Sequence, residues 1–128
     1  MNDELEDLVV SGKELDRKLV AGILSPYMRL DKDDCTIRPL ESWSTLTTNH
    51  KIFLYLLARK AMVVLDFGLD EEGATTKEVI SDTGIKEGTA KPVLRRLLGD
   101  KIIAQSKSRR YFVPNYSIEK IKSILSKD

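Results

Sequence analysis

Hydrophobic residues recur at helical spacing in the first two dozen positions, which predicts two helical pieces. Leu5, Leu8 and Val9 form the apolar face of the first piece. Ser11 and Glu14 have the spacing of a capping box, which predicts a new helix start before a second apolar stripe. That stripe consists of Leu15, Leu19, Ile23 and Leu24. The dipeptide at positions 25–26 (Ser-Pro) ends the run, because the residue before proline avoids helical backbone angles.

The next pattern is shorter and predicts a hairpin followed by a connector. Residues 27–30 and 35–38 have the composition of two short strands around the polar turn at residues 31–34. Residues 39–48 then form a connector that carries Trp43, which we expect to anchor the core rather than to stack on a ligand. A long apolar helix follows, starting near Thr47 or Thr48 and ending at Gly68. This helix is apolar on more than one face and is therefore predicted to lie at the centre of the domain.

The second half of the chain predicts two short helices, a small hairpin and a final helix. Thr75 and Glu78 form another capping box, and Gly84 ends the helix that they start. After a three-residue turn, a second helix has an inner stripe that consists of Ala90, Val93, Leu94, Leu97 and Leu98, and Gly99 and Asp100 close it. Residues 102–105 and 111–113 predict strands joined by a basic loop at 106–110. Ser117 is the expected cap of a last helix, whose apolar positions are Ile118, Ile121, Ile124 and Leu125.

Pro92 limits where the second of these short helices can begin. Proline fits a helix without loss only in the first turn. Either the regular helix begins near Thr89, whose hydroxyl would cap it, or the helix is kinked at Pro92. We expect a helix over residues 89–99, which shortens the surface available to read DNA bases and favours weak or shape-based binding.

The order helix, short helix, turn, helix, strand, basic loop, strand resembles the winged helix-turn-helix family. The residues that carry the resemblance are Gly84-Ile85, Thr89-Ala90, Leu94 with Leu97-Leu98, and Ile102-Ile103. The chain as a whole is similar to small archaeal winged-helix regulators. The resemblance implies a mainly α fold with a small β wing. The expected organisation is an N-terminal helical and hairpin extension at 1–45, a winged-helix domain at 46–116 and a C-terminal helix at 117–128.

Charge is unevenly distributed along the chain, although the total is nearly neutral. The 128 residues carry a formal net charge of +1, which excludes a histone-like polycation. Residues 1–34 hold 5 basic and 9 acidic side chains, whereas residues 73–128 hold 12 basic and 6 acidic ones. Such asymmetry is typical of nucleic-acid interaction.

The resemblance and the charge together predict a double-stranded DNA interface on the second half of the chain. We expect the second short helix to approach the major groove and the basic loop to lie on the flanking backbone. The expected contact residues are Lys77, Lys86, Thr89, Lys91, Arg95, Arg96, Lys107, Arg109 and Arg110. One alternative is a winged helix that serves only as a protein-interaction module, with the basic face solvated. RNA binding is a third possibility.

Other function classes find little support in the residues. Cys35 and His50 come from a predicted hairpin and a helix start without a catalytic motif, so we expect no enzyme activity. Residues 31–34 lack the glycine and glutamate of a calcium loop, and we expect neither a metal nor a cofactor. One cysteine, an acidic N-terminus and the lack of a long apolar run predict a cytoplasmic protein without a membrane span. The stripes of the terminal helices fit packing within the chain and a homodimer interface equally well.

Overall fold

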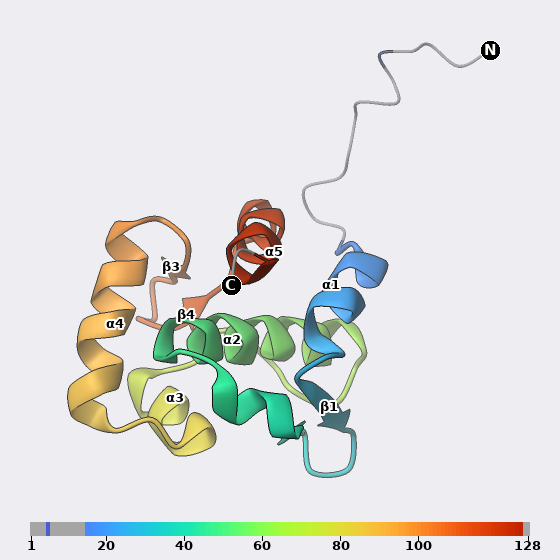
Figure 1. Ribbon diagram of the computed structural model, residues 1–128, viewed down its shortest axis with the longest axis horizontal. Coiled ribbons are helices and arrows are strands. Elements are labelled where there is room, and N and C mark those ends of the chain that lie inside the picture. Colours follow the sequence, from blue (N-terminus) through green and yellow to red (C-terminus); the bar gives the residue numbers. More distant parts are fainter. Residues whose placement is uncertain (1–4, 6–14, 127–128) are drawn as a thin grey trace.

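The long helix α2 (Thr48–Val64) lies at the centre of the computed structural model, which describes Leu5 and residues 15–126. The other helices surround it, and α2 contacts α1, α3, α4, α5 and the strand β4 (Figure 1). The remaining elements in chain order are α1 (Arg17–Leu24), β1 (Met28–Asp31), β2 (Thr36–Pro39), the 3-10 turn η2 (Glu41–Thr45), α3 (Thr76–Thr83), α4 (Glu87–Gly99), β3 (Ala104–Gln105), β4 (Tyr111–Phe112), the 3-10 turn η3 (Asn115–Ser117) and α5 (Ile118–Ser126). Over the described residues the fold is thus helix-rich with two small antiparallel hairpins.

Helix α2 has the predicted start and a different end. The helix begins at Thr48, as predicted, and the Thr47 side chain caps it by accepting a hydrogen bond from the His50 amide. Gly68 does not end the helix. Instead Asp66 adopts the left-handed conformation (φ 60°), and the Phe67 amide donates to the Met62 carbonyl at 3.1 Å. An aspartate can occupy this position because its short polar side chain tolerates the left-handed region.

The N-terminal helix α1 begins later than the pattern predicted. Asp16 is its cap and accepts from the Leu19 amide at 3.0 Å, so Leu15 precedes the helix. The predicted cap at Ser11 and the stripe positions Leu8 and Val9 lie outside the described residues. The hairpin that follows is confirmed within one residue, with Leu30 opposite Ile37. The Asp31 carboxylate accepts from the Asp33 and Asp34 amides, so the acidic run is a polar turn.

Helices α3 and α4 meet through a tight turn at Gly84. The capping box of Thr75 and Glu78 and the left-handed Gly84 (φ 76°) are both confirmed. The predicted start of α4 at Thr89 is wrong, because α4 begins at Glu87 after the cap residue Lys86. Pro92 therefore lies inside the helix. It is exposed, and its missing amide hydrogen leaves only the Gly88 carbonyl without a helical partner.

The β3–β4 hairpin is shorter than predicted, with two residues in each strand. Ile102 and Ile103 are buried but lie in a turn, because the left-handed Lys101 (φ 61°) reverses the chain directly after α4. Ala74 adds a single bridge to Tyr111 on the other side of β4.

Ser117 does not cap α5. Its hydroxyl is buried and has no hydrogen-bond partner among the described residues.

One hydrophobic core joins the N-terminal helix, the central helices and α5. Trp43 is buried in it as predicted, and Cys35 is partly buried. Four members of the terminal stripes are buried within this core, namely Ile23, Leu24, Ile118 and Ile121, whereas Leu15, Leu19, Ile124 and Leu125 are only partly buried. No helix in the described part of the chain has the length and apolar character needed to cross a membrane.

Candidate nucleic-acid interface

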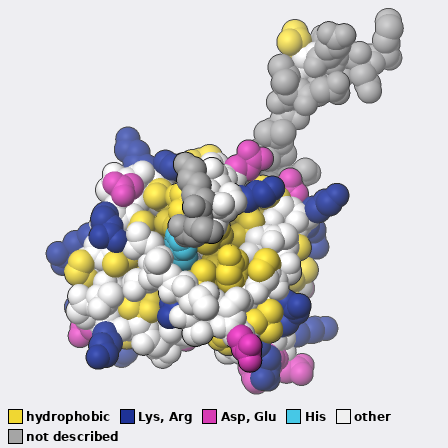
Figure 2. All heavy atoms as spheres, in the orientation of Figure 1, with side chains coloured by type: hydrophobic (Ala, Val, Ile, Leu, Met, Phe, Trp, Pro, Cys, Tyr) yellow, Lys and Arg dark blue, Asp and Glu magenta, His cyan; other side chains and the backbone are white. Residues whose placement is uncertain are grey.

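Helix α4 presents an apolar face to the core and a basic face to solvent. Ala90, Val93, Leu94 and Leu97 are buried, as the stripe predicted. Arg95 and Arg96 lie on the opposite side and are exposed. Lys and Arg side chains project along the edge of the molecule where α4 lies (Figure 2). Gly88, Pro92 and Gly99 are also exposed on this helix, so its outer surface between the arginines carries only short side chains.

The N-terminus of α4 offers backbone donors beside a lysine. Lys86 is the cap residue and its side chain makes no capping hydrogen bond. The Thr89 and Ala90 amides both donate to the Lys86 carbonyl, which leaves the amides of Glu87 and Gly88 as the unpaired donors of the first turn. Unpaired amides and the positive end of the helix dipole favour a negatively charged group such as phosphate. Thr89 is exposed at the same end.

The basic loop of the β3–β4 hairpin divides into an outward part and an inward part. The Arg109 amide donates to the Ser106 carbonyl at 3.0 Å, and Arg109 adopts the left-handed conformation (φ 63°). This turn leaves Lys107 and Arg109 exposed at the tip. Arg110 lies against the body of the protein, where its guanidinium contacts Glu78, Glu71 and the Gly73 carbonyl.

The eight basic residues among the nine predicted to contact DNA fall into two groups by their partners, and the ninth residue is Thr89. Lys91 pairs with Glu87 at 2.7 Å, Arg96 donates to the Asn49 side chain at 2.7 Å, and Arg110 is held internally. The other basic side chains have no hydrogen bond or ion pair to another described residue, and they are Lys77, Lys86, Arg95, Lys107 and Arg109. We call these five the free cations.

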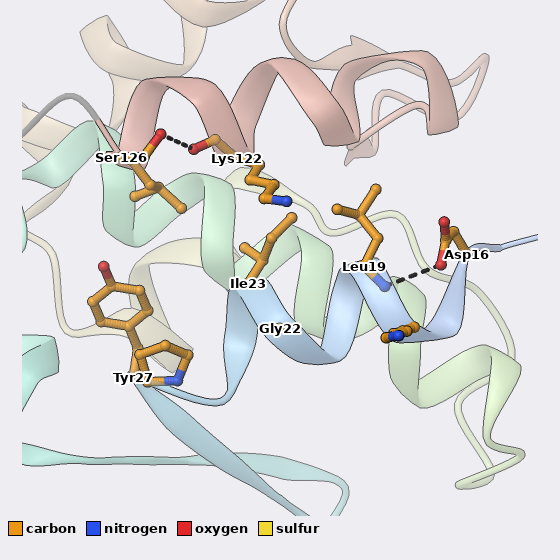
Figure 3. Close-up of a pocket in the computed structure, with 10 residues that line it drawn as sticks. Asp16, Leu19, Gly22, Ile23, Tyr27, Lys122 and Ser126 are labelled. Carbon is orange, nitrogen blue, oxygen red and sulfur yellow. Dashed lines mark hydrogen bonds between the residues drawn. The ribbon is translucent and has the colours of Figure 1, made fainter.

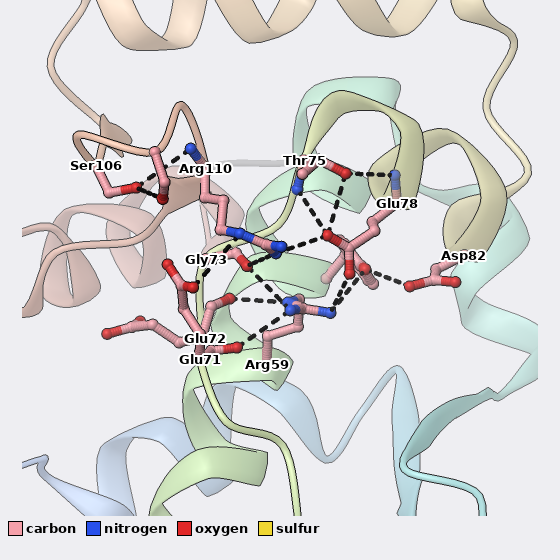
Figure 4. Close-up of polar contacts among 11 residues, drawn as sticks. Arg59, Glu71, Glu72, Gly73, Thr75, Glu78, Asp82, Ser106 and Arg110 are labelled. Atoms are coloured by element: carbon pink, nitrogen blue, oxygen red, sulfur yellow. Dashed lines mark hydrogen bonds and ion pairs between the residues drawn. The ribbon is translucent and has the colours of Figure 1, made fainter.

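A buried arginine that the sequence did not single out holds this half of the molecule together (Figure 4). Arg59 of α2 is only 6% exposed. It donates three hydrogen bonds, of 2.8–3.1 Å, to the carbonyls of the α2–α3 loop at Glu71, Glu72 and Gly73. Its guanidinium also lies 3.6 Å from the Glu78 carboxylate. The signal that could have found it is the charged pair Arg59-Lys60, which interrupts the apolar run from Ile52 to Leu65.

Glu78 is the point where this network meets the hairpin. One of its oxygens accepts from the Thr75 amide at 3.1 Å and from Arg110 at 2.8 Å, and the other faces Arg59. Partial burial alone would raise the pKa of Glu78, but the hydrogen bonds from Thr75 and the charges of Arg59 and Arg110 hold that pKa below its usual value. The acidic side chain therefore serves as a link between α2, α3 and β4.

A second polar link joins α2 to the end of α3. The Tyr55 hydroxyl donates to Asp82 at 2.5 Å. Burial and this bond to a carboxylate raise the pKa of Tyr55 above its usual range. Glu78, Asp82 and Glu87 thus each have a partner within the chain. Glu78 and Glu87 are thereby ion-paired within the chain, whereas Asp82 accepts a hydrogen bond from a neutral hydroxyl and keeps its negative charge.

The depressed pKa of Glu78 predicts a loss of stability in acid. A carboxyl group whose pKa is lower in the folded state stabilises the fold above its unfolded pKa, and this contribution disappears as the pH falls through the folded pKa. We expect the free energy of unfolding, measured by urea titration from pH 7 to pH 3, to fall below about pH 4.5. Glu78→Gln should flatten that fall. The exposed Glu87→Gln is the control, and an equal flattening by both variants would contradict the link assigned to Glu78.

No protein-family model, curated protein or solved structure matches this chain. Among the described residues, no group of three or more His, Cys, Asp or Glu side chains is placed to hold a metal ion. The described residues thus form a basic face with free cations and contain no such group of metal-binding side chains.

Proposed function

We propose that the chain is a winged-helix transcription regulator that binds double-stranded DNA through α4 and the tip of the β3–β4 hairpin. The proposal rests on which charged side chains of this face have a partner within the chain and which do not. The free cations Lys86, Arg95, Lys107 and Arg109 lie at the start of α4, on α4 and at the hairpin tip, whereas the carboxylates of Glu78 and Glu87 are ion-paired within the chain. Cations without an internal partner attract a polyanion.

The order of elements supports a winged helix in this role. Helices α2, α3 and α4 pack on one another, and the β3–β4 hairpin follows α4 directly. The bridge of Ala74 to Tyr111 adds one residue of a third strand before α3. In this arrangement α4 approaches the major groove, and the short side chains on its outer face allow its backbone to come close. The hairpin tip then contacts the flanking phosphates.

Binding to duplex DNA across a salt series tests the proposal. Four neutralised phosphates correspond to a slope of about −3.6 in log K against log salt, so the affinity should fall about a hundredfold between about 50 and 200 mM salt. Fluorescence anisotropy with a labelled mixed-sequence duplex measures this slope. Duplex RNA and single-stranded DNA of equal length are the comparison ligands, and stronger binding to either would overturn the DNA assignment.

A protein-interaction module is the second candidate, favoured by the apolar recesses beside α1. One recess lies between α1 and α5, where Leu19, Ile23 and Leu125 line it (Figure 3). Apolar surface of this kind is typical of protein contacts. Failure to bind any nucleic acid at low salt would favour this candidate over the first.

A further inference from the structure

Helix α1 lies between two recesses, and the recess on its α2 side is mostly apolar. This recess, which we call the α1–α2 groove, is formed by α1, β1 and the end of α2 and has a volume of about 350 Å³. The residues of α1 and its C-cap that line the groove recur at helical spacing. They are Arg17, Val20, Ala21, Leu24 and Ser25. The groove therefore follows the whole of this eight-residue helix, a length of about 12 Å.

The floor of the α1–α2 groove is formed by buried apolar side chains. Val20, Leu24 and Met28 are each at most 5% exposed. Leu65, at the end of α2, lines the same groove but remains 47% exposed, so an apolar ligand would remove more of its surface from water. The volume is that of a small-molecule site, and it is too small for a partner helix, whose diameter is about 10–12 Å.

The charged groups that line the α1–α2 groove, among the described residues, are two arginines. Beyond the C-terminal end of α1, the Arg29 guanidinium donates to the carbonyls of Ser25 and Met28 at 2.6 and 2.8 Å. Arg17 lies in the first turn of α1, at the opposite end, and makes no hydrogen bond or ion pair to another described residue. The neighbouring Asp16 carboxylate accepts from a backbone amide of α1 and lines the other recess. The groove thus combines an apolar floor with a positive rim, which is complementary to an amphiphilic anion.

We propose that the α1–α2 groove binds a small amphiphilic carboxylate of the medium-chain fatty acid class. The alkyl chain lies along α1 on the buried floor and covers Leu65, and the carboxylate pairs with Arg17. The positive end of the α1 dipole favours the carboxylate at the Arg17 end of the groove, whereas the carbonyls at the Arg29 end disfavour it. This site is separate from the proposed DNA interface, because none of the five free cations lines it.

The recess on the other side of α1 provides the matched control. It lies between α1 and α5 and has a volume of about 480 Å³. Asp16, Lys18 and Lys122 give its lining both signs of charge, so it does not select an anion in the same way. Lys18 follows Arg17 directly and is also an exposed cation, but it lines this recess and not the α1–α2 groove.

Isothermal titration calorimetry of the full chain with sodium decanoate, kept below its micelle concentration, tests the proposal. We expect saturable binding, and decylammonium, which has the same chain and the opposite charge, should bind about tenfold more weakly. Arg17→Glu should remove this preference for the anion, whereas Lys18→Glu should leave it unchanged. Ala21→Phe fills the groove from an exposed position of α1 and should abolish the binding of both ligands. Circular dichroism checks that each variant is folded.

Four results would overturn the proposal. The first is a folded wild-type chain that shows no saturable binding of decanoate. The second is equal affinity of the wild type for decanoate and decylammonium, because the arginine rim would then select nothing. The third is an effect of Lys18→Glu as large as that of Arg17→Glu, since the ligand would then lie elsewhere. The fourth is a wild-type dimer in sedimentation equilibrium that Leu65→Glu separates into monomers, because a second copy would then cover the groove.

Discussion

Replacing Arg59 with methionine is expected to lower the free energy of unfolding by about 3–5 kcal/mol, the range for removing one partner of a buried ion pair. Methionine fills much of the same volume, so the loss reports the polar contacts. The Glu71 and Glu72 carbonyls would lose their side-chain donor, and the Gly73 carbonyl would keep only the bond from Arg110. Glu78 would also lose one of its two cations. Urea unfolding followed by circular dichroism measures the change.

Lys60→Met is the matched control for this prediction. Lys60 is the next residue of α2, has the same charge and is 8% exposed, but its side chain contacts the carboxylate of Glu72 instead of loop carbonyls. We expect a smaller loss, of about 1–3 kcal/mol, because this variant leaves one carboxylate without its donor, whereas the Arg59 variant removes the donor of three carbonyls and a cation beside Glu78. If the Arg59 variant lost no more stability than the Lys60 variant, the three loop carbonyls would not depend on Arg59.

The elements that the sequence predicted well are those fixed by local chemistry. The capping box of Thr75 and Glu78 requires only residues three apart, and the left-handed turn at Gly84 requires only a missing side chain. The inner stripe of α4 follows from helical spacing alone. These features could be read from the chain because each is decided within one or two turns of helix.

Helix ends and strand lengths depended on contacts that the pattern does not contain. Asp66 and Lys101 adopt left-handed turns that the pattern had assigned to glycines or to strand starts. In both turns a backbone amide returns to a carbonyl of the preceding helix and satisfies it. Pro92 is tolerated inside α4, since the buried residues Val93, Leu94 and Leu97 hold the helix against the core.

The sequence could predict which cations form the candidate interface, but not which of them have partners within the chain. Arg109 and Arg110 are adjacent in sequence and identical in chemistry. The Arg110 side chain bonds to Glu78, 32 positions away, and that contact exists only once β4 lies beside α3. Arg59 was missed for the same reason, because its carbonyl acceptors lie 12–14 residues along the chain.

Replacing Arg95 and Arg109 together with alanine is expected to weaken DNA binding by about tenfold to a hundredfold at low salt. Both side chains are exposed free cations, one on α4 and one on the hairpin tip. Loss of two phosphate contacts should reduce the slope of log K against log salt by about 1.8. Stability should stay within about 0.5 kcal/mol of the wild type, as for surface positions without internal partners. Anisotropy titrations across the salt series measure the slope.

Arg110→Ala separates DNA contact from support of the hairpin. Its guanidinium is occupied by Glu78, Glu71 and the Gly73 carbonyl, so this variant should lose about 1 kcal/mol of stability while its salt slope stays close to that of the wild type. Lys120→Ala, an exposed lysine on α5, should change neither quantity. A salt slope that falls for Arg110→Ala and not for the Arg95 and Arg109 variant would show that the inward arginine contacts DNA. The division of the basic side chains by their internal partners would then be wrong, because the ion pair with Glu78 would have to open in the complex.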